Sequence, residues 1–359
     1  MFDSFTPVTG SLGGSMIGLA SAILLLGNGD ILGASGIMSS ILTDPKKALA
    51  DGGNLWKLGL LTTFLVTSAL MPQFASDPKS IEDKDVPIPS SIAYVLAGLL
   101  VGYGTRMGNG CTSGHGICGL GRLSPRSAVA VMTFMATGAA TAVVTSPKAS
   151  WADATSFLRT ADDAVAAPTI IPELGYAITA VFAIALLFVM PSMVKSNGGF
   201  QQEDKSKFLG GASAGVAFAA GLAISGMVLP SKLYTFLDVE GIADGTWDPT
   251  LMTVMGCGIP VSFLAYQLVP NFGVGLLGSK AVMSHPIETK AFHVPTNRKI
   301  DWNLIMGEAM FGMGWGLGLL CPGPALYHVG VGNVMVISRW MPAFVVGAIL
   351  AQKVKAKQQ

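Results

Sequence analysis

Residues 108–124, "GNGCTSGHGICGLGRLS", interrupt a strongly apolar stretch with six glycines, two cysteines and a histidine. In a lipid bilayer each unsatisfied backbone N–H or C=O costs several kcal/mol, so non-helical backbone is tolerated only where it is buried in protein or lines a wet cavity. This stretch therefore predicts a break in a membrane-inserted segment, and that break is expected to line a pathway.

The composition of the whole chain is typical of a membrane protein. The 359 residues have a mean hydropathy of +0.56 and are 51% hydrophobic and 12% charged, whereas soluble domains average about 25% charged residues. Glycine fills 45 positions, and small residues let transmembrane helices pack closely. The net charge of +1 gives no basic footprint for nucleic acid. We expect a bilayer-embedded protein without a nucleic-acid partner.

Apolar segments of spanning length divide the rest of the chain. A spanning helix needs about 20 mostly apolar residues, with a range of about 17 to 25. The sequence predicts about nine such spans, at approximately 11–27, 55–71, 92–107, 126–145, 173–191, 208–226, 249–270, 302–320 and 334–352. The predicted fold class is an all-α membrane protein that forms a single polytopic domain over residues 1–359.

The distribution of positive charge predicts the orientation in the membrane. With nine crossings, most of the 22 lysines and arginines fall on one side, and the positive-inside rule assigns that side to the cytoplasm. The N-terminus is then outside and the C-terminus is cytoplasmic. We expect a multi-pass protein of the plasma or inner membrane.

Four stretches share one plan, in which an apolar glycine-rich helix runs into a small-residue break and then a short amphipathic piece. They are "GLASAILLLGNGDILGASGIMSSIL", "LAGLLVGYGTRMGNGCTSGHGICGLGRLS", "GVAFAAGLAISGMVLPSKLYTFLD" and "MFGMGWGLGLLCPGPALYHVG". Each piece after the break is too short to span, which predicts four re-entrant hairpins. Two fall in a first half-repeat at about 11–145 and two in a second at about 208–353. One linking span at 173–191 would make the repeat inverted, the usual plan of a secondary transporter.

The second and fourth hairpins have features that favour an anion. Glycines let backbone N–H groups converge, and a short helix that begins after a break points its positive end at the site. In "CPGPALYHVG", Pro322 and Pro324 fit a first helical turn and Cys321 falls near the N-cap. In the first hairpin, Asp30 is expected to act as a cap.

The cysteine thiols, which are polarisable and weak donors, suggest which anion the pathway would conduct. The middle of the spans has no Lys or Arg, so we expect weak, repeated stations rather than one tight bidentate site. A protonated thiol is a soft, weak donor that matches a sulfur-bearing anion better than a hard oxyanion.

Several residues have two interpretations at this stage. Cys111, His115 and Cys118 form a C-x3-H-x2-C pattern, but a structural zinc needs a fourth ligand and longer spacing. Cys118 is balanced between a functional thiol and core packing, and Cys257 is interpreted as packing. Glu308 is either an intramembrane carboxylate with a functional partner or a solvated residue near the interface.

These residues resemble the YeeE/YedE family of membrane proteins, whose characterised members take up thiosulfate. "GNGCTSGHGICGLGRLSPRS" is similar to that family's signature, and "FGMGWGLGLLCPGPAL" is similar to its C-terminal motif. The stretches "GLAISGMVLPSKLYTFLDVEG" and "WDPTLMTVMG" resemble another recurring segment. The resemblance implies nine spanning helices and short re-entrant helices arranged as an hourglass, with cysteines at the constriction passing thiosulfate by S–H···S contacts.

Carried over by position, the family's central cysteines are Cys111 and Cys321. The first hairpin departs from the pattern, because "GNGDILGASGI" contains no cysteine. Gly33, Ser35 and Gly36 are candidates to line the entrance in its place. The expected permeation residues are Cys111, Cys321, Gly110, Thr112, Ser113, Gly114, His115, Gly116 and Gly323, with Cys118, Ser35, Gly36 and Glu308 as further candidates.

The predicted function is uptake of a small sulfur-containing anion, most simply thiosulfate, by a transporter rather than an enzyme. The expected partners are that anion, the lipid bilayer and a soluble sulfur carrier on the cytoplasmic side. No flavin, haem or dinucleotide motif is present, so we expect no cofactor. One alternative is a membrane-embedded sulfur-transfer or redox protein that uses Cys111 and Cys118, and another is a metal-ion transporter that uses the Cys/His hairpin.

Overall fold

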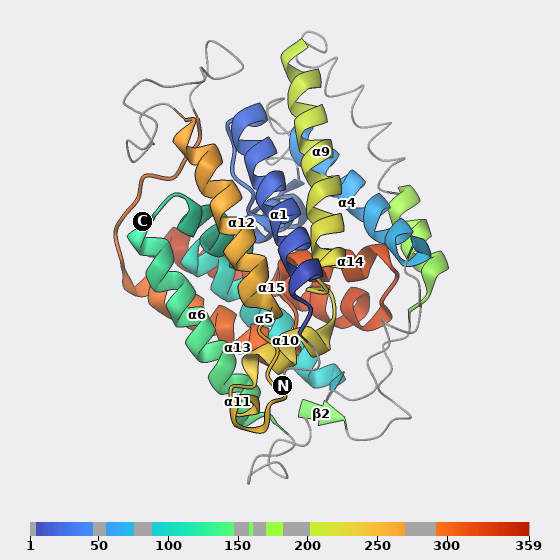
Figure 1. The fold of residues 1–359 in the computed structure, drawn as a ribbon, viewed down its shortest axis with the longest axis vertical. Helices are drawn as coiled ribbons and strands as arrows, with labels where there is room; N and C mark the ends of the chain where they lie inside the picture. The colour runs from blue at the N-terminus through green and yellow to red at the C-terminus, as the bar shows by residue number, and fades with distance from the viewer. Residues whose placement is uncertain are drawn as a thin grey trace.

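The computed structural model describes residues 5–45, 55–74, 88–146, 158–160, 170–181, 202–269 and 292–358. These residues are overwhelmingly helical (Figure 1). They also contain a two-residue strand β1 (Ile88–Pro89) that pairs antiparallel with β2 (Arg159–Thr160). The predicted all-α class is confirmed.

The long helices fall where the sequence predicts spans. They are α1 (Pro7–Ile23), which continues into the π-helix η1 (Leu24–Asn28), α4 (Leu55–Phe74), α5 (Ser91–Gly108), α6 (Pro125–Val144), α9 (Gln202–Ile224), α12 (Thr250–Gln267), α13 (Trp302–Gly318), and α15 (Met341–Gln358), which follows the π-helix η6 (Val336–Trp340). Residues 172–181 are also helical, and the rest of the predicted span 173–191 lies outside the described residues.

Length and composition identify five described helices that can cross a membrane, or six when the bent pair of α13 and α14 (Pro322–Gly330) counts as one span. The chain is therefore an integral membrane protein, and the count of nine spans stays a prediction. The axes of α13 and α14 differ by 40° across their break.

Four short helices occupy the predicted hairpin positions. They are α2 (Ala34–Thr43), the π-helix η4 (Thr112–Gly119), α10 (Pro230–Leu237) and α14. Another short helix, α11 (Gly241–Asp244), follows α10. The prediction that Asp30 caps the first hairpin is wrong. The N-cap of α2 is Gly33, and Asp30 Oδ1 instead lies 3.2 Å from Nδ1 of His293.

The long helices pack in two matching sets of helix pairs. One set contains the pairs α1–α12 and α5–α15, and the other contains α9–α4 and α13–α6. α1 packs on α12 as α9 packs on α4, and α5 packs on α15 as α13 packs on α6. The helix pairs α1–α9 and α5–α13 join the two sets. In Figure 1, α1 lies between α9 and α12.

Each set of helix pairs also has a glycine at a helix crossing where the neighbouring backbone leaves no room for a side chain. A Cβ at Gly102 of α5 would collide with the carbonyl of Phe344, and a Cβ at Gly312 of α13 would collide with the carbonyl of Phe134. The high glycine content therefore serves close backbone approach between helices.

Candidate functional site

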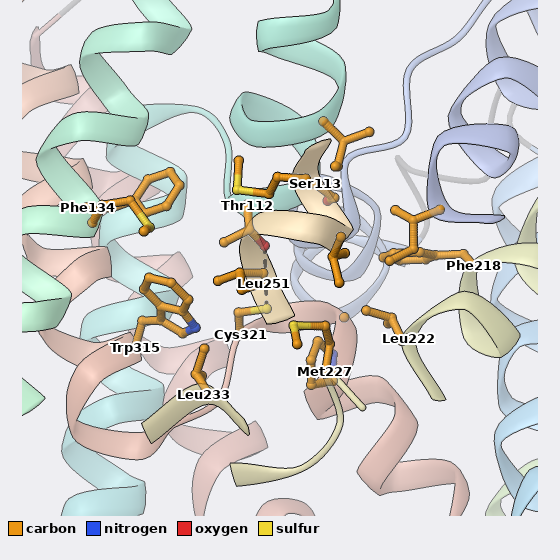
Figure 2. Close-up of a pocket in the computed structure, with 17 residues that line it drawn as sticks. Thr112, Ser113, Phe134, Phe218, Leu222, Met227, Leu233, Leu251, Trp315 and Cys321 are labelled. Atoms are coloured by element: carbon orange, nitrogen blue, oxygen red, sulfur yellow. Dashed lines mark hydrogen bonds between the residues drawn. The ribbon is translucent and has the colours of Figure 1, made fainter. Parts of the chain in front are cut away.

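Three of the four short helices meet at one point. The Ala34 N–H at the start of α2 donates to Ser113 Oγ at 3.1 Å, and Ser113 Oγ lies 3.3 Å from the Cys111 thiol. One residue along, Thr112 Oγ1 lies 3.5 Å from the thiol of Cys321 (Figure 2). The structure thus brings together four of the predicted permeation residues, from the second and fourth hairpins, and ties them to the first.

The two central cysteines follow the same sequence of backbone conformations. The C-cap of α5 is Asn109 with φ 71° and the C-cap of α13 is Leu319 with φ 54°, both left-handed. Two residues later, Cys111 and Cys321 take extended conformations as the N-caps of η4 and α14. Each thiol therefore lies at the positive end of a short helix, where helix dipoles favour an anion. The predicted N-cap position of Cys321 is confirmed.

On one side of this meeting point is an apolar chamber of about 80 Å³. Thr112, Ser113, Cys321 and Gly323 contribute to its wall, and the remaining lining residues are mostly large and apolar. Figure 2 shows Phe134 and Trp315 on one side of Cys321 and Phe218 and Leu222 on the other. None of the 17 lining residues carries a charged side chain.

A second, larger cavity of about 300 Å³, which we term the cationic cavity, is lined by other residues of η4. The C-terminal end of α5, the N-terminal end of α6 and the start of α2 form its walls. Its basic lining residues are Lys57, Arg106, Arg122, Arg126 and His115, and the lining also includes Gly33, Ser35, Gly36, Gly110 and Gly114. The predicted entrance residues of the first hairpin therefore face the same space as part of η4.

His115 and Glu308 form a buried pair behind η4. His115 Nε2 lies 3.3 Å from Glu308 Oε1, and its Nδ1 lies 3.0 Å from Ser127 Oγ. Glu308 has no solvent exposure, so the interpretation of this residue as solvated near the interface is wrong. Side chains at Gly108 and Gly110 would collide with Glu308 and His115, so the two glycines make room for the pair.

The arginine beside this pair is anchored at the start of α6. Arg126 is buried, its Nη2 donates to the Gly108 carbonyl at 3.4 Å, and its Nη1 donates to the Lys299 carbonyl. It also lies 3.5 Å from Asp301. The cavity therefore holds positive charge fixed in place by the protein.

The other candidate residues are separate from the meeting point. Cys118 is fully buried, with its thiol 3.3 Å from the Leu32 carbonyl and 3.1 Å from Ser21 Oγ. Cys257 is half-buried on α12. A Cβ at Gly116 would touch Met255, at 3.5 Å.

The C-x3-H-x2-C pattern does not converge on one point. Cys111, His115 and Cys118 contact Ser113, Ser127 and Leu32 respectively. Within the described part of the chain, no group of three or more His, Cys, Asp or Glu side chains is placed to hold a metal ion.

The sequence analysis predicted neither the arginines that line the cationic cavity nor the aromatic residues that line the apolar chamber. Arg106 and Arg126 flank residues 108–124 in the sequence and Arg122 lies within them, and this spacing was a usable signal for a basic cavity. Nothing in the sequence marks Trp315 as a residue that would face Cys321.

Two family profiles match the chain. A profile described as "Sulphur transport" matches residues 9–141, and a profile of a family of unknown function, DUF6691, matches residues 207–358. The first match contains Cys111 and the second contains Cys321. Both central cysteines therefore lie in family-matched segments.

Curated relatives from Xylella fastidiosa are named "Probable transporter". One, from strain Temecula1, is 35% identical over 133 residues, which are 36% of this chain and 80% of the relative. Another, from strain 9a5c, is 42% identical over 137 residues, which are 36% of this chain and 89% of the relative. Together, the sulphur-transport profile and the transporter relatives indicate membrane transport of a sulfur compound, not enzymatic catalysis. The chain belongs to the YeeE/YedE-like family of sulfur transporters.

Proposed function

We propose that this protein imports a small sulfur-containing anion, most simply thiosulfate, and that the anion passes between the apolar chamber and the cationic cavity at the contact of Thr112 with Cys321. The observation that carries the proposal is the position of the Cys321 thiol. It lines the chamber, contacts η4 at 3.5 Å, and stands at the N-terminus of α14.

The chemistry of the two spaces suits a passing anion. The arginines of the cationic cavity lower the energy of an anion that has crossed from the chamber and regains water. At the hairpins, thiols, hydroxyls and helix N-termini replace that water without binding the ion tightly, which conduction requires. η4 contacts α2 through Ser113 and α14 through Thr112. In this proposal η4 therefore separates the chamber from the cavity, and the anion must pass it.

Cys111 has a different place in the pathway from Cys321. Its thiol is 1% exposed and is not among the residues lining either of these two spaces. We assign Cys321 as the anion contact in the chamber and Cys111 as a second contact, buried next to η4.

The inverted-repeat architecture is part of the proposal. The exchange of α1 with α9, α4 with α12, α5 with α13, and α6 with α15 maps the main helix packings onto one another. The matching left-handed ends of α5 and α13 support the same symmetry. The positive-inside rule then places the cationic cavity on the cytoplasmic side, where a soluble sulfur carrier would receive the anion.

Uptake of radiolabelled thiosulfate into proteoliposomes tests the function, with sulfate, sulfite and selenite as competitors and two imposed pH gradients. We expect saturable uptake that unlabelled thiosulfate abolishes and sulfate does not. Equal competition by sulfate would contradict selection for a soft sulfur anion, and absence of uptake would contradict the function itself.

A further inference from the structure

The chamber contains a buried hydrogen-bond donor that has no partner among the described residues. Trp315 is 2% exposed, and its indole Nε1 forms no hydrogen bond there. Trp315 lines the chamber together with Cys321. Figure 2 shows the indole nitrogen on the side of the ring that faces Cys321.

A donor left in this state is costly unless something else accepts from it. A buried unsatisfied N–H costs about 1–3 kcal/mol, and native proteins leave few such groups without a structural or functional reason. Packing fixes the ring in place, because Trp315 lies edge-on to Phe134 and stacks on Phe311, with centroid distances of 5.8 and 6.3 Å. The N–H therefore points into the chamber from a rigid support.

The chamber walls limit what the donor can bind. Among the described residues, no charged side chain lines the chamber, and its polar groups come from neutral residues such as Thr112, Ser113 and Cys321. An ion held there must be bound by uncharged donors alone. Such a site penalises a compact, strongly hydrated anion more than one whose charge is spread over a large sulfur atom, because the desolvation cost falls as the ion grows.

We infer that Trp315 is a binding residue of the apolar chamber, whose indole N–H donates a hydrogen bond to an oxygen of the transported anion beside Cys321. This inference rests on the proposed function. It adds a nitrogen donor to the thiol and hydroxyl groups and makes the chamber an anion site without a formal positive charge. Selectivity for a soft sulfur oxyanion then arises in the chamber rather than in the cationic cavity.

The chain offers a matched control for this residue. Trp340 is also fully buried, its Nε1 has no hydrogen-bond partner in the described part of the chain, and its ring stacks on that of Phe344 with centroids 5.2 Å apart. It is not among the residues that line the chamber. Trp315→Phe and Trp340→Phe therefore delete the same chemical group, and only the first deletes it from the proposed site.

The first measurement is the concentration dependence of thiosulfate uptake by proteoliposomes. Trp315→Phe should raise the half-saturating concentration about tenfold or more, the effect of losing one hydrogen bond to a charged acceptor, while Trp340→Phe should change it less than about twofold. Equal effects of the two substitutions, or no effect of Trp315→Phe, would overturn the inference.

The second measurement does not depend on whether Trp315→Phe folds. In wild-type protein with isotope-labelled indole nitrogens, titration with sodium thiosulfate should shift one indole N–H resonance, and the same resonance should shift in Trp340→Phe. If wild-type protein takes up thiosulfate and no indole resonance moves, the inference fails and the proposed function stands. If wild-type protein takes up no thiosulfate, the proposed function fails and the inference falls with it.

Discussion

The cationic cavity and the apolar chamber are lined by different residues of η4 and have opposite chemistry. The cavity is roomy, is lined by Arg106, Arg122 and Arg126, and is backed by the buried pair of His115 and Glu308. The chamber is small and has no charged residue in its lining. Under the proposed function, the difference separates two tasks of an anion transporter: uncharged donors decide which ion can shed its water, and positive charge stabilises the ion after it has crossed.

The strongest test of this division is to obstruct the cavity without disturbing the fold. A Cβ at Gly114 meets nothing within 4 Å, and Gly114 lines the cavity. Gly114→Phe should therefore assemble and lower thiosulfate uptake at least about tenfold by narrowing a wet passage.

Gly256→Phe is the control for that substitution. A Cβ at Gly256 also meets nothing within 4 Å, but this glycine lies on an exposed part of α12 outside the cavity lining. Its uptake should match that of wild type. Normal uptake by Gly114→Phe would show that the anion does not pass along this wall.

Removal of the buried carboxylate behind the cavity should have the next largest effect, on stability. Glu308→Ala leaves His115 Nε2 without its neighbour at 3.3 Å, and a buried polar group left unpaired costs about 1–3 kcal/mol. The exposed carboxylate of Glu173 gives the comparison, because Glu173→Ala should change stability by less than about 0.5 kcal/mol. Thermal unfolding of the two variants in detergent would measure this difference in stability. Equal unfolding midpoints for Glu308→Ala and Glu173→Ala would refute a structural pairing of His115 with Glu308.

A smaller effect is expected when one charge of the cavity is removed. Arg122→Gln should raise the half-saturating concentration for thiosulfate about two- to fivefold at low ionic strength, and this difference should shrink as salt screens the field. Arg339 is exposed and does not line the cavity, so Arg339→Gln serves as the control. A salt-independent change at Arg122 would point to a specific contact instead of long-range attraction.

The smallest effect is expected at the rim of the cavity. Asp30 and His293 lie 3.2 Å apart, and the His293 side chain is 66% exposed. Solvent-exposed ion pairs contribute about 0–1 kcal/mol, so His293→Ala should lower the unfolding free energy by well under 1 kcal/mol, as measured by thermal unfolding. A larger loss would mean that this rim contact holds the first hairpin in place.

Local sequence rules predicted the parts of the fold that depend on local physics. The limit on spanning length located the long helices, and the glycine and proline breaks located α2, η4, α10 and α14. The same rules predicted Cys321 as an N-cap, because Pro322 fits the first turn that follows it. These features are set by a few neighbouring residues.

Contacts between distant segments could not be predicted in this way. Thr112 and Cys321 are 209 positions apart, and Asp30 and His293 are 263 apart. The prediction for Asp30 failed for this reason. The first N–H of α2 is satisfied by Ser113 from another hairpin, so no local cap is needed. The partner of Glu308 and the orientation of Trp315 likewise depend on how the two halves pack.

Thiosulfate uptake by cysteine variants tests the central claim most directly. Cys111→Ala and Cys321→Ala should each lose most of their uptake, whereas Cys257→Ala, which replaces a half-buried thiol on α12, should transport like wild type. If Cys111→Ala and Cys321→Ala both transport at the wild-type rate, the sulfur anion does not depend on these thiols and the proposed pathway is wrong.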